Sequence, residues 1–422
     1  MGIDLSDIVV LRWDSTSNCA PLLESGGIDA VWLEVPDDAS AGKCRAAGAQ
    51  VLPAGAIRSL KLEEAGRAKP GETVAIQAGT WPGATAGSRG GGAFVAGATN
   101  RAWVDANGYL IGYLRALHPE QAPVLAYRPD KDAGIAVGRV IAYESLELAL
   151  ADSWCAGGNY ILAPDAAYRD ALVAGNEAAM RAWKKMGQTA RWLKKQRSLF
   201  RGPLSSGVTV LVEPGDATAE IANLMYRQSA SPDLVAVSRL PAPDPVRRPI
   251  VVAAGIHSVS ADLAKNLLAH ARAGATVVTD ACEDPVWWRV PGLKSTRQFE
   301  DREFFSIGSG RLVAYKEIIT DPGDFAQDVL DLAADRRPVR MWDLSAGIAT
   351  VSMNGVRSAT LRLVNYGSPA RSDVLVHVHG TFSSATLLHP EGDAISLRTY
   401  RRGVNTEVMV PGLVRVAAVQ FS

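Results

Sequence analysis

Short apolar runs alternate with helix-like stretches through residues 1–202, which is the sequence pattern of repeated βα units. An acidic residue stands at or just past the end of many of these runs, where a buried strand reaches water. The carboxyl ends of parallel strands meet on one rim, and barrel and doubly wound enzymes place their chemistry there. The acids in these positions are Asp14, Glu34, Asp105, Asp130, Glu144 and Asp165. The pattern therefore predicts a charged rim above a parallel sheet.

Eight apolar runs in this part of the chain suit the strands of a small (β/α)8 barrel of the TIM type. The predicted strands span residues 8–13, 30–35, 50–53, 73–77, 101–104, 123–127, 139–143 and 159–162. Helices are predicted over residues 20–25, 41–47, 57–68, 109–117 and 146–156. The stretch 167–200 carries apolar side chains at helical spacing, which predicts the closing helix or helix pair.

A second α/β pattern covers residues 208–340, where the apolar runs are continuous and β-branched, as in strands covered on both faces. This predicts a flavodoxin-like sheet. The segment AAGIHS after its central run does not match the GxSxG elbow, so a structural or oligomerisation role is favoured. Short runs after residue 340, separated by Gly, Pro and Asn turns, predict an antiparallel β-sandwich. The expected domains are therefore 1–202, 203–340 and 341–422.

Composition limits the classes of partner. The formal net charge is zero, from 44 basic and 44 acidic residues, and this gives no electrostatic case for nucleic acid or an anionic membrane. No apolar run approaches membrane-spanning length, so we expect a soluble protein. The sequence leaves open that an export signal has been removed. The four cysteines stand far apart without a CxxC pair and are expected to be small buried side chains.

No cofactor or metal is predicted. The long glycine-rich loop 79–97 matches neither GxGxxG nor GxxxxGK[ST] between a strand and a helix, which disfavours a phosphate cradle. Among the six histidines, His377 and His379 stand two residues apart on one face of a predicted strand. Two such side chains are at best half of a zinc site.

Carboxylate pairs across a barrel mouth are typical of glycoside hydrolysis, in which one acid protonates the leaving oxygen and the other attacks the sugar or activates water. Glu144 is the first candidate for nucleophile or base, because it ends the predicted seventh strand. It also precedes Ser145 and a helical run. The competing interpretation is therefore a charge that stabilises a helix N-terminus.

Asp105 and Asn107 stand beside Trp103 in the segment WVDANG, directly before an amphipathic helix. In one interpretation the two polar side chains bond sugar hydroxyls while Trp103 stacks on an apolar sugar face. In the other, Asp105 or Asn107 caps the helix and Trp103 is a core residue. The sequence leaves both open.

Arg12, Trp13 and Asp14 close the predicted first strand. Residues two apart point to the same side of an extended strand, so Arg12 and Asp14 are predicted to pair with each other. Such a pair favours a structural role over catalysis. Trp13 is a candidate sugar-stacking ring, although most tryptophans belong to the core.

Further candidates for sugar contacts follow other strands. Trp32 and Trp81 add planar rings near strand ends, where rings suit sugar recognition. Tyr127 and Arg128 follow the predicted sixth strand and are placed to line the cleft. Arg128 would bind an anionic substrate group or, alternatively, form a solvated salt bridge.

The order of a barrel with strand-end acids, a flavodoxin-like domain without a nucleophile and a small β-sandwich resembles the three-domain bacterial β-galactosidases. Patches such as WVDANGYLIGYLRAL, AGGNYILAP and LVEPGDATAEIANLMYR carry the resemblance. The resemblance implies a catalytic barrel, an amidotransferase-like trimerisation domain and a C-terminal β domain. It also implies a carbohydrate partner and a homo-oligomer, either a trimer or a dimer.

The resembling family carries its acid/base glutamate after the fourth strand, behind an asparagine, and a second glutamate after the seventh. Here the predicted fourth strand ends at Gln77 without an acid, while Glu144 matches the second position. Glu34 and Asp105 are the best substitutes. We therefore expect either a glycoside hydrolase with a rearranged acid pair or a carbohydrate-binding or scaffold protein that has lost the chemistry. An amidotransferase- or hydrolase-like enzyme centred on 203–340 is disfavoured, because the elbow is missing.

Overall fold

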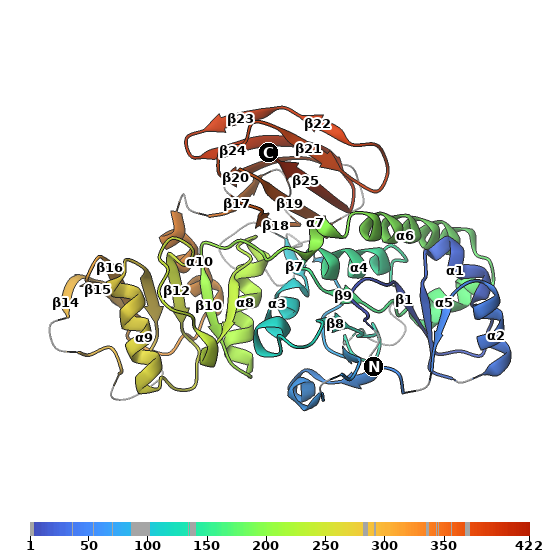
Figure 1. Cartoon of the computed structure of the whole chain (residues 1–422), viewed down its shortest axis with the longest axis horizontal. Helices are drawn as coiled ribbons and strands as arrows, with labels where there is room; N and C mark the ends of the chain where they lie inside the picture. The colour runs from blue at the N-terminus through green and yellow to red at the C-terminus, as the bar shows by residue number, and fades with distance from the viewer. Residues whose placement is uncertain are drawn as a thin grey trace, which may run out of the picture.

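The computed structural model places three sheet-based parts side by side (Figure 1). Helices and parallel strands of the N-terminal part lie at one end, a larger, mostly parallel sheet lies at the other, and an all-β part covers their junction. The structure describes residues 4–35, 37–53, 55–69, 71–85, 102–133, 135, 141–281, 286–290, 293–334, 337–342, 344, 346–355, 357–367 and 372–422. The chain is thus a mixed α/β protein. Among these residues, no helix is both long and apolar enough to cross a membrane.

The N-terminal part contains seven parallel strands in chain order. One sheet holds β1 (Val10–Trp13), β2 (Ala30–Leu33) and β3 (Gln50–Leu52). A second holds β4 (Arg58–Leu60), β5 (Val74–Ile76), β8 (Val124–Leu125) and β9 (Asn159–Tyr160). A parallel bridge between Leu11 and Leu162 joins the two sheets, and the amide of Arg12 donates to the carbonyl of Leu162 at 2.8 Å.

The predicted closed eight-stranded barrel is wrong for the described residues, where β3 and β4 belong to different sheets. β3 is three residues long and leaves Gln50 exposed, so little apolar surface is available to close the ring. The predicted strand 101–104 is instead β7 (Trp103–Asp105), which pairs antiparallel with β6 (Gly83–Thr85). Residues 141–143 form no strand, and the rest of the predicted strand 139–143 lies outside the described residues.

The predicted helix over 57–68 is also wrong in its first half. β4 occupies its start, and a 3-10 helix, η1 (Leu62–Arg67), follows directly. A strand of three residues is too short to show a period of two, which explains why the sequence hid it. The run 73–77 therefore supplies the fifth parallel strand, β5, and not the fourth.

Helices cover the outside of these strands. They are α1 (Ala20–Gly26), α2 (Asp38–Ala46), α3 (Gly108–Leu117), α4 (Ser145–Cys155), α5 (Ala166–Val173), α6 (Glu177–Lys195) and α7 (Ser198–Arg201). α6 buries Trp183, Met186 and Leu193 along one stripe, as its helical spacing predicts. Gly187 lets α6 approach α1 closely, because a Cβ there would lie 2.0 Å from the carbonyl oxygen of Ser25.

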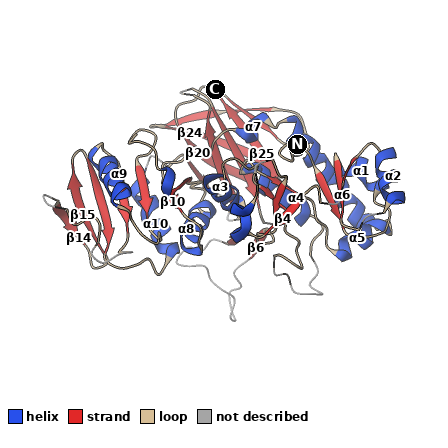
Figure 2. Cartoon of the chain, turned by 60° about the horizontal axis from the view of Figure 1, so that its bottom comes forward, coloured by secondary structure: helices blue, strands red, loops and turns tan. Residues whose placement is uncertain are grey.

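The middle part is a seven-stranded sheet in the order β11-β10-β12-β13-β16-β15-β14. Figure 2 shows β14 and β15 at the outer end of this sheet. Its strands are β10 (Thr209–Val212), β11 (Asp233–Ala236), β12 (Ile250–Ala253), β13 (Thr276–Thr279), β14 (Lys294–Gln298), β15 (Arg302–Ile307) and β16 (Gly310–Tyr315). The five parallel strands follow the order 2-1-3-4-5 of doubly wound sheets, and β14 and β15 add an antiparallel edge.

Helices cover both faces of the middle sheet. They are α8 (Asp216–Arg227), α9 (Ala261–Arg272) and α10 (Pro322–Ala333), with a short 3-10 helix, η2 (Val237–Arg239). Val252 and Val278 pack in the same apolar cluster as Met225 of α8, whereas Val251 and Val277 pack with α9. Burial on both faces explains the continuous β-branched runs of this region.

The last part is a sandwich of two antiparallel sheets. One contains β17 (Val339–Trp342), β20 (Ser372–His379), β24 (Asn405–Leu413) and β23 (Thr399–Arg402). The other contains β18 (Gly347–Met353), β19 (Ala359–Asn365), β25 (Val416–Phe421), β21 (Ala385–Leu388) and β22 (Ile395–Leu397). Alternate residues such as Val376, Val408 and Leu361 fill the space between the sheets. β19 contacts α4, so this second sheet faces the N-terminal part.

Candidate active site

Glu34 lies just past the end of β2, between two arginines that come from other strand ends. Its Oε1 accepts from Nε of Arg12 at 2.7 Å and also contacts Nη2 of the same guanidinium. Its Oε2 lies 3.6 Å from Nη1 of Arg128. The Glu34 side chain is 22% exposed and that of Arg12 only 4%. The carboxylate is thus held on the rim but still reaches solvent.

Both arginines are fixed by further contacts. Arg12 donates from Nη1 to the carbonyl of Ala126 at 2.9 Å and lies over the ring of Trp32, 4.7 Å from its centroid. The backbone amide and Nε of Arg128 donate to Asp132 at 2.8 and 3.3 Å. Strands β1, β2 and β8 therefore converge on one carboxylate, and we call Arg12, Glu34 and Arg128 the rim cluster.

The predicted pairing of Arg12 with Asp14 is wrong. Arg12 is 5% exposed and turns toward Glu34, while Asp14 pairs with Nη1 of Arg169 from α5. Register explains the difference, because β2 runs parallel beside β1 and Trp32 pairs with Arg12, which places Glu34 two residues past that pair on the neighbouring segment. Trp13 is 1% exposed and donates its Nε1 to the carbonyl of Ser17, as a core residue does.

Glu144 does not end a strand, contrary to the sequence-based prediction. It is half-buried and directly precedes α4, and its side chain forms no capping bond with that helix. It still lies on the rim side, because α4 follows the loop after the carboxyl end of β8. Its charge is near Tyr168, where burial first and then Glu144 raise the pKa of the phenol. Asp165, another strand-end acid, caps α5 by accepting from the amide of Tyr168 at 2.8 Å.

Asp105 and Trp103 both contact Arg227, a residue of the middle part. Asp105 accepts from Nε1 of Trp103 at 3.0 Å and lies 3.4 Å from Nη2 of Arg227. The guanidinium of Arg227 stacks 3.6 Å from the centroid of Trp103. This three-residue contact attaches β7 to α8.

Asn107 and Tyr127 are buried beneath the rim. Asn107 is 1% exposed, accepts from the amide of Thr80 at 2.8 Å, and donates to the Tyr127 hydroxyl at 3.0 Å. Burial raises the pKa of Tyr127 well above its ordinary value. Trp81 is half-buried and meets the Tyr127 ring edge-on at 6.1 Å. Gly79 is required here, because a Cβ at its φ of +147° would lie 2.7 Å from the Tyr127 ring.

Two glutamates that the sequence interpretation passed over follow the true fourth strand. Glu63 is exposed at the start of η1, and Glu64 accepts from the amide of Lys61 at 3.3 Å and from Arg67 at 3.0 Å. They were missed because β4 was assigned to a helix, where acids are common in the first turn. Gln77 consequently follows the fifth parallel strand.

A buried carboxylate of the N-terminal part bonds to the sandwich at the place where the middle part also packs. Asp152 of α4 is fully buried and accepts from the Tyr366 hydroxyl of the sandwich at 2.5 Å and from the Asn107 amide at 2.7 Å. Desolvation raises its pKa from 3.8 to about 6. Tyr226 of α8 packs beside it, and a Cβ on Gly108 would lie 1.9 Å from the Tyr226 hydroxyl oxygen. We call this set, together with Arg362, the junction.

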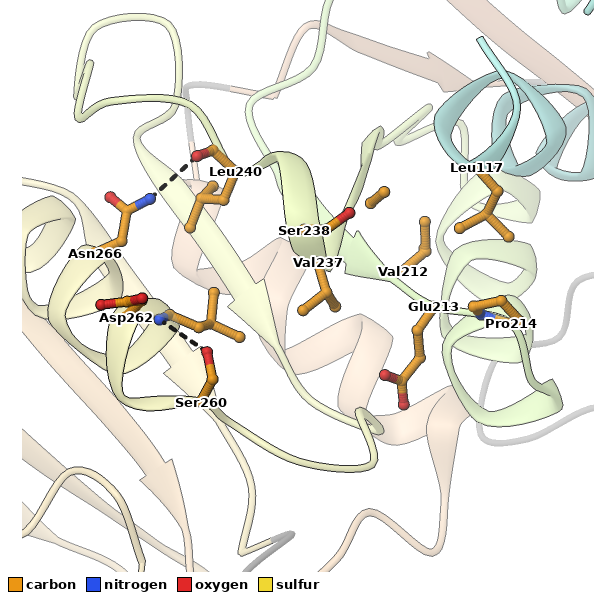
Figure 3. Close-up of a pocket in the computed structure, with 12 residues that line it drawn as sticks. Leu117, Val212, Glu213, Pro214, Val237, Ser238, Leu240, Ser260, Asp262 and Asn266 are labelled. Carbon is orange, nitrogen blue, oxygen red and sulfur yellow. Dashed lines mark hydrogen bonds between the residues drawn. The ribbon is translucent and has the colours of Figure 1, made fainter. Parts of the chain in front are cut away.

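A pocket of about 540 Å³ lies at the carboxyl ends of β10 and β11, beside the first turn of α9 (Figure 3). Leu117 of α3 closes one side, and Glu213 and Asp262 bring carboxylates to it. Ser260 uses its hydroxyl to cap the amide of Leu263 at 3.2 Å. Ligands of doubly wound sheets bind at this edge.

Metal ligands are not gathered in the part of the chain that the structure describes, where no group of three His, Cys, Asp or Glu side chains could hold an ion. His377 bonds Glu407 at 2.6 Å instead. Cys19 and Cys44 are both buried, with their sulfurs 3.5 Å apart.

No protein-family model and no curated protein sequence matches the chain. Its structural neighbours are glycoside hydrolases. An α-L-fucosidase isoenzyme from Paenibacillus thiaminolyticus superposes with a TM-score of 0.52 at 10% identity, over 96% of this chain and 78% of that one. A GH42 β-galactosidase, Gan42B, gives 0.46 at 11% identity, and a β-galactosidase from Rahnella sp. R3 gives 0.46 at 10%.

The shared lengths differ between these neighbours. The match to Gan42B covers 74% of this chain but only 56% of Gan42B, whereas the match to the Rahnella enzyme covers 99% of both chains. At such identities the likeness concerns the fold alone. The fucosidase, with its higher score, is the neighbour on which the comparison of folds rests.

Proposed function

We propose that this chain is a glycoside hydrolase that acts on a glycoside or oligosaccharide through carboxylates on the strand rim. The observation that carries the proposal is the rim cluster, in which Arg12 and Arg128 hold Glu34 at the ends of three parallel strands. A carboxylate fixed between two cations keeps one orientation, as a nucleophile or general base requires. The fold that the chain shares with a fucosidase supports this assignment.

The proton donor that we propose is Glu144, with Asp105 as the second choice. Glu144 is half-buried on the rim side and forms no capping bond, so its carboxyl group is available to a leaving oxygen. Asp105 is less suitable, because Arg227 and Trp103 already hold it. Trp81 and Arg128 are the proposed contacts for the sugar.

We further propose the arrangement of three domains that supports this site. Residues 1–202 would form a small, incompletely closed (β/α)8-like barrel, residues 203–340 a flavodoxin- or amidotransferase-like domain that mediates homo-oligomer formation, and residues 341–422 the β-sandwich. The barrel-like assignment is supported by the seven parallel strands, which follow one another in chain order. The flavodoxin-like assignment is supported by the strand order of the middle sheet.

The test is hydrolysis of a panel of 4-nitrophenyl glycosides by the wild type, Glu144→Gln and Glu63→Gln. Loss of a general acid lowers turnover by about 100-fold or more, so Glu144→Gln should fall that far. Glu63→Gln is the matched control, because Glu63 is an exposed glutamate on the same rim and should leave turnover unchanged. Equal turnover of the wild type and Glu144→Gln would remove Glu144 from the mechanism.

A non-catalytic carbohydrate-binding or scaffold protein is the second candidate. The favouring observation is that four rim acids are engaged in ion pairs, namely Asp14, Glu34, Asp105 and Asp132. Such pairs stabilise a rim without performing chemistry on it. Binding of oligosaccharides at this rim without turnover of any glycoside would establish this alternative.

A further inference from the structure

The outer face of the β17-β20-β24-β23 sheet points away from the rest of the chain. The other sheet of the sandwich contacts α4, whereas β23 and β24 lie on the far side (Figure 1). Alternate residues of these strands fill the sandwich core, so the remaining ones project outward. We call these outward residues the outer face, and they comprise Arg340, Trp342, Leu375, His377, His379, Arg398, Tyr400, Arg402, Asn405, Glu407 and Met409.

Large apolar side chains are exposed on the outer face. Trp342 is 40% exposed, Tyr400 42% and Met409 45%. Leaving a tryptophan and a tyrosine in water forgoes the stabilisation that their burial would give. Trp342 and Tyr400 stand on the two edge strands, three strand spacings or about 14 Å apart across the sheet. Two rings at this separation suit an extended ligand.

Polar groups between the two rings are already oriented. Strand pairing puts His377 opposite Glu407, and Glu407 opposite Tyr400. Glu407 Oε2 lies 2.6 Å from Nε2 of His377 and 3.4 Å from Nε of Arg402. The imidazole of His377 in turn lies 4.3 Å from the ring of Trp342, centroid to centroid. Within the described residues, only Oε2 of this carboxylate is bonded, so Oε1 is available to a hydroxyl donor.

This combination fits a carbohydrate better than a protein or a nucleic acid. Sugars present apolar ring faces that stack on aromatic rings and hydroxyls that bond to carboxylates and guanidinium groups. The core of a protein interface is depleted of charged residues, whereas here Tyr400 shares its cross-strand row with Glu407, His377 and Arg340. Nucleic acid requires an excess of free cations, yet Arg402 is paired with Glu407 and Arg398 lies over Tyr400.

We propose that the outer face is a second carbohydrate-binding site, separate from the rim and able to bind a polysaccharide chain. Trp342 and Tyr400 stack on two sugar units, and His377, Glu407 and Arg402 bond the hydroxyls between them. The ligand class follows from the chemistry of this face, and binding there needs no hydrolysis at the rim. The sandwich would thereby hold the chain on a polymer.

Native gel electrophoresis in gels cast with soluble galactan, galactomannan, xylan or pectin tests the proposal, with a polymer-free gel as reference. At least one polymer should retard the wild type. Trp342→Ala and Tyr400→Ala should each raise the dissociation constant about tenfold or more. Val246→Ala is the control, because Val246 is an 89% exposed apolar side chain of the middle part, and its mobility should match the wild type.

Two further measurements separate this proposal from the function of the rim. Glu34→Gln should remain retarded, and Trp342→Ala should keep any hydrolysis of 4-nitrophenyl glycosides. Unchanged unfolding midpoints of Trp342→Ala and Tyr400→Ala would establish that both variants fold.

Three results would overturn the proposal. One is a wild type that none of the four polymers retards, and another is equal retardation of the two aromatic variants and the wild type. The third is a wild-type dimer, measured by light scattering, that Trp342→Ala converts to a monomer, because the outer face would then join two copies of the chain.

Discussion

The rim and the junction hold charged groups in opposite ways. On the rim, Glu34 is 22% exposed and is held by side chains of opposite charge from neighbouring strands. At the junction, Asp152 and Arg362 are fully buried and are held by a tyrosine hydroxyl, backbone amides and carbonyls. The rim keeps its charge next to solvent, where a substrate can reach it, while the junction removes its charge from solvent entirely.

This difference separates function from assembly. A buried charge is costly unless all its bonds are made, so the junction responds strongly to a single missing partner. The rim carboxylates reach solvent, so replacing one of them should cost less stability than removing a partner at the junction. We therefore expect substitutions at the junction to change the free energy of unfolding and substitutions on the rim to change activity.

Arg362→Met should give the largest effect on stability. The guanidinium donates to the carbonyls of Leu199, Cys155 and Gly202 and to the Ser352 hydroxyl, at 2.8 to 3.1 Å. Methionine removes all four of these bonds from a buried site, which should lower the free energy of unfolding by about 3 kcal/mol or more.

Urea unfolding followed by tryptophan fluorescence measures the effect of Arg362→Met. Arg401→Met is the matched control, because Arg401 is exposed on β23, and it should change the free energy of unfolding by less than about 0.5 kcal/mol. Similar changes in the free energy of unfolding for the two variants would contradict the distinction between junction and surface.

Asp152 should give the next largest effect, which is a dependence of the free energy of unfolding on pH. Its pKa is raised from 3.8 to about 6, so the folded chain binds this proton more tightly than the unfolded chain. The contribution to stability is fully present below pH 3.8 and is lost as the pH rises through 6. Between pH 8 and pH 5 the free energy of unfolding should therefore rise by about 1–2 kcal/mol from this group.

The measurement for Asp152 is the difference between the wild type and Asp152→Asn across that pH range, since other groups titrate there too. The Asn side chain cannot titrate, so the wild-type gain on acidification should be absent from the variant. Parallel pH profiles for the two proteins would contradict the buried, proton-binding state of Asp152.

Sequence patterns predicted the parts of the fold that have a clear period. The continuous β-branched runs gave β10, β12 and β13, and the alternating runs of the last 80 or so residues gave the sandwich. β4 was missed because Arg58, Ser59 and Leu60 are too few to show alternation. Closure of the barrel was wrongly expected, since strand count alone does not determine which edges pair.

The candidate site was predictable in position but not in its contacts. Asp14 and Glu34 follow β1 and β2 as the strand-end pattern predicts, whereas Asp105 ends β7 of a separate antiparallel pair. Their partners could not be predicted, because Arg169 is 155 residues away from Asp14 and Arg227 is 122 residues away from Asp105. The junction gave no local signal at all, because Asp152 lies in an ordinary helical stretch and meets Tyr366 only through the tertiary fold.

The value of kcat/KM for the best 4-nitrophenyl glycoside, measured for the wild type, Glu34→Gln and Asp14→Asn, tests the central claim most directly. Both variants remove one rim charge, but only Glu34 is assigned to the chemistry. We predict that Glu34→Gln lowers kcat/KM by about 100-fold or more, while Asp14→Asn stays within about threefold of the wild type. A folded Glu34→Gln variant with wild-type kcat/KM, or an equal loss in Asp14→Asn, would contradict the account.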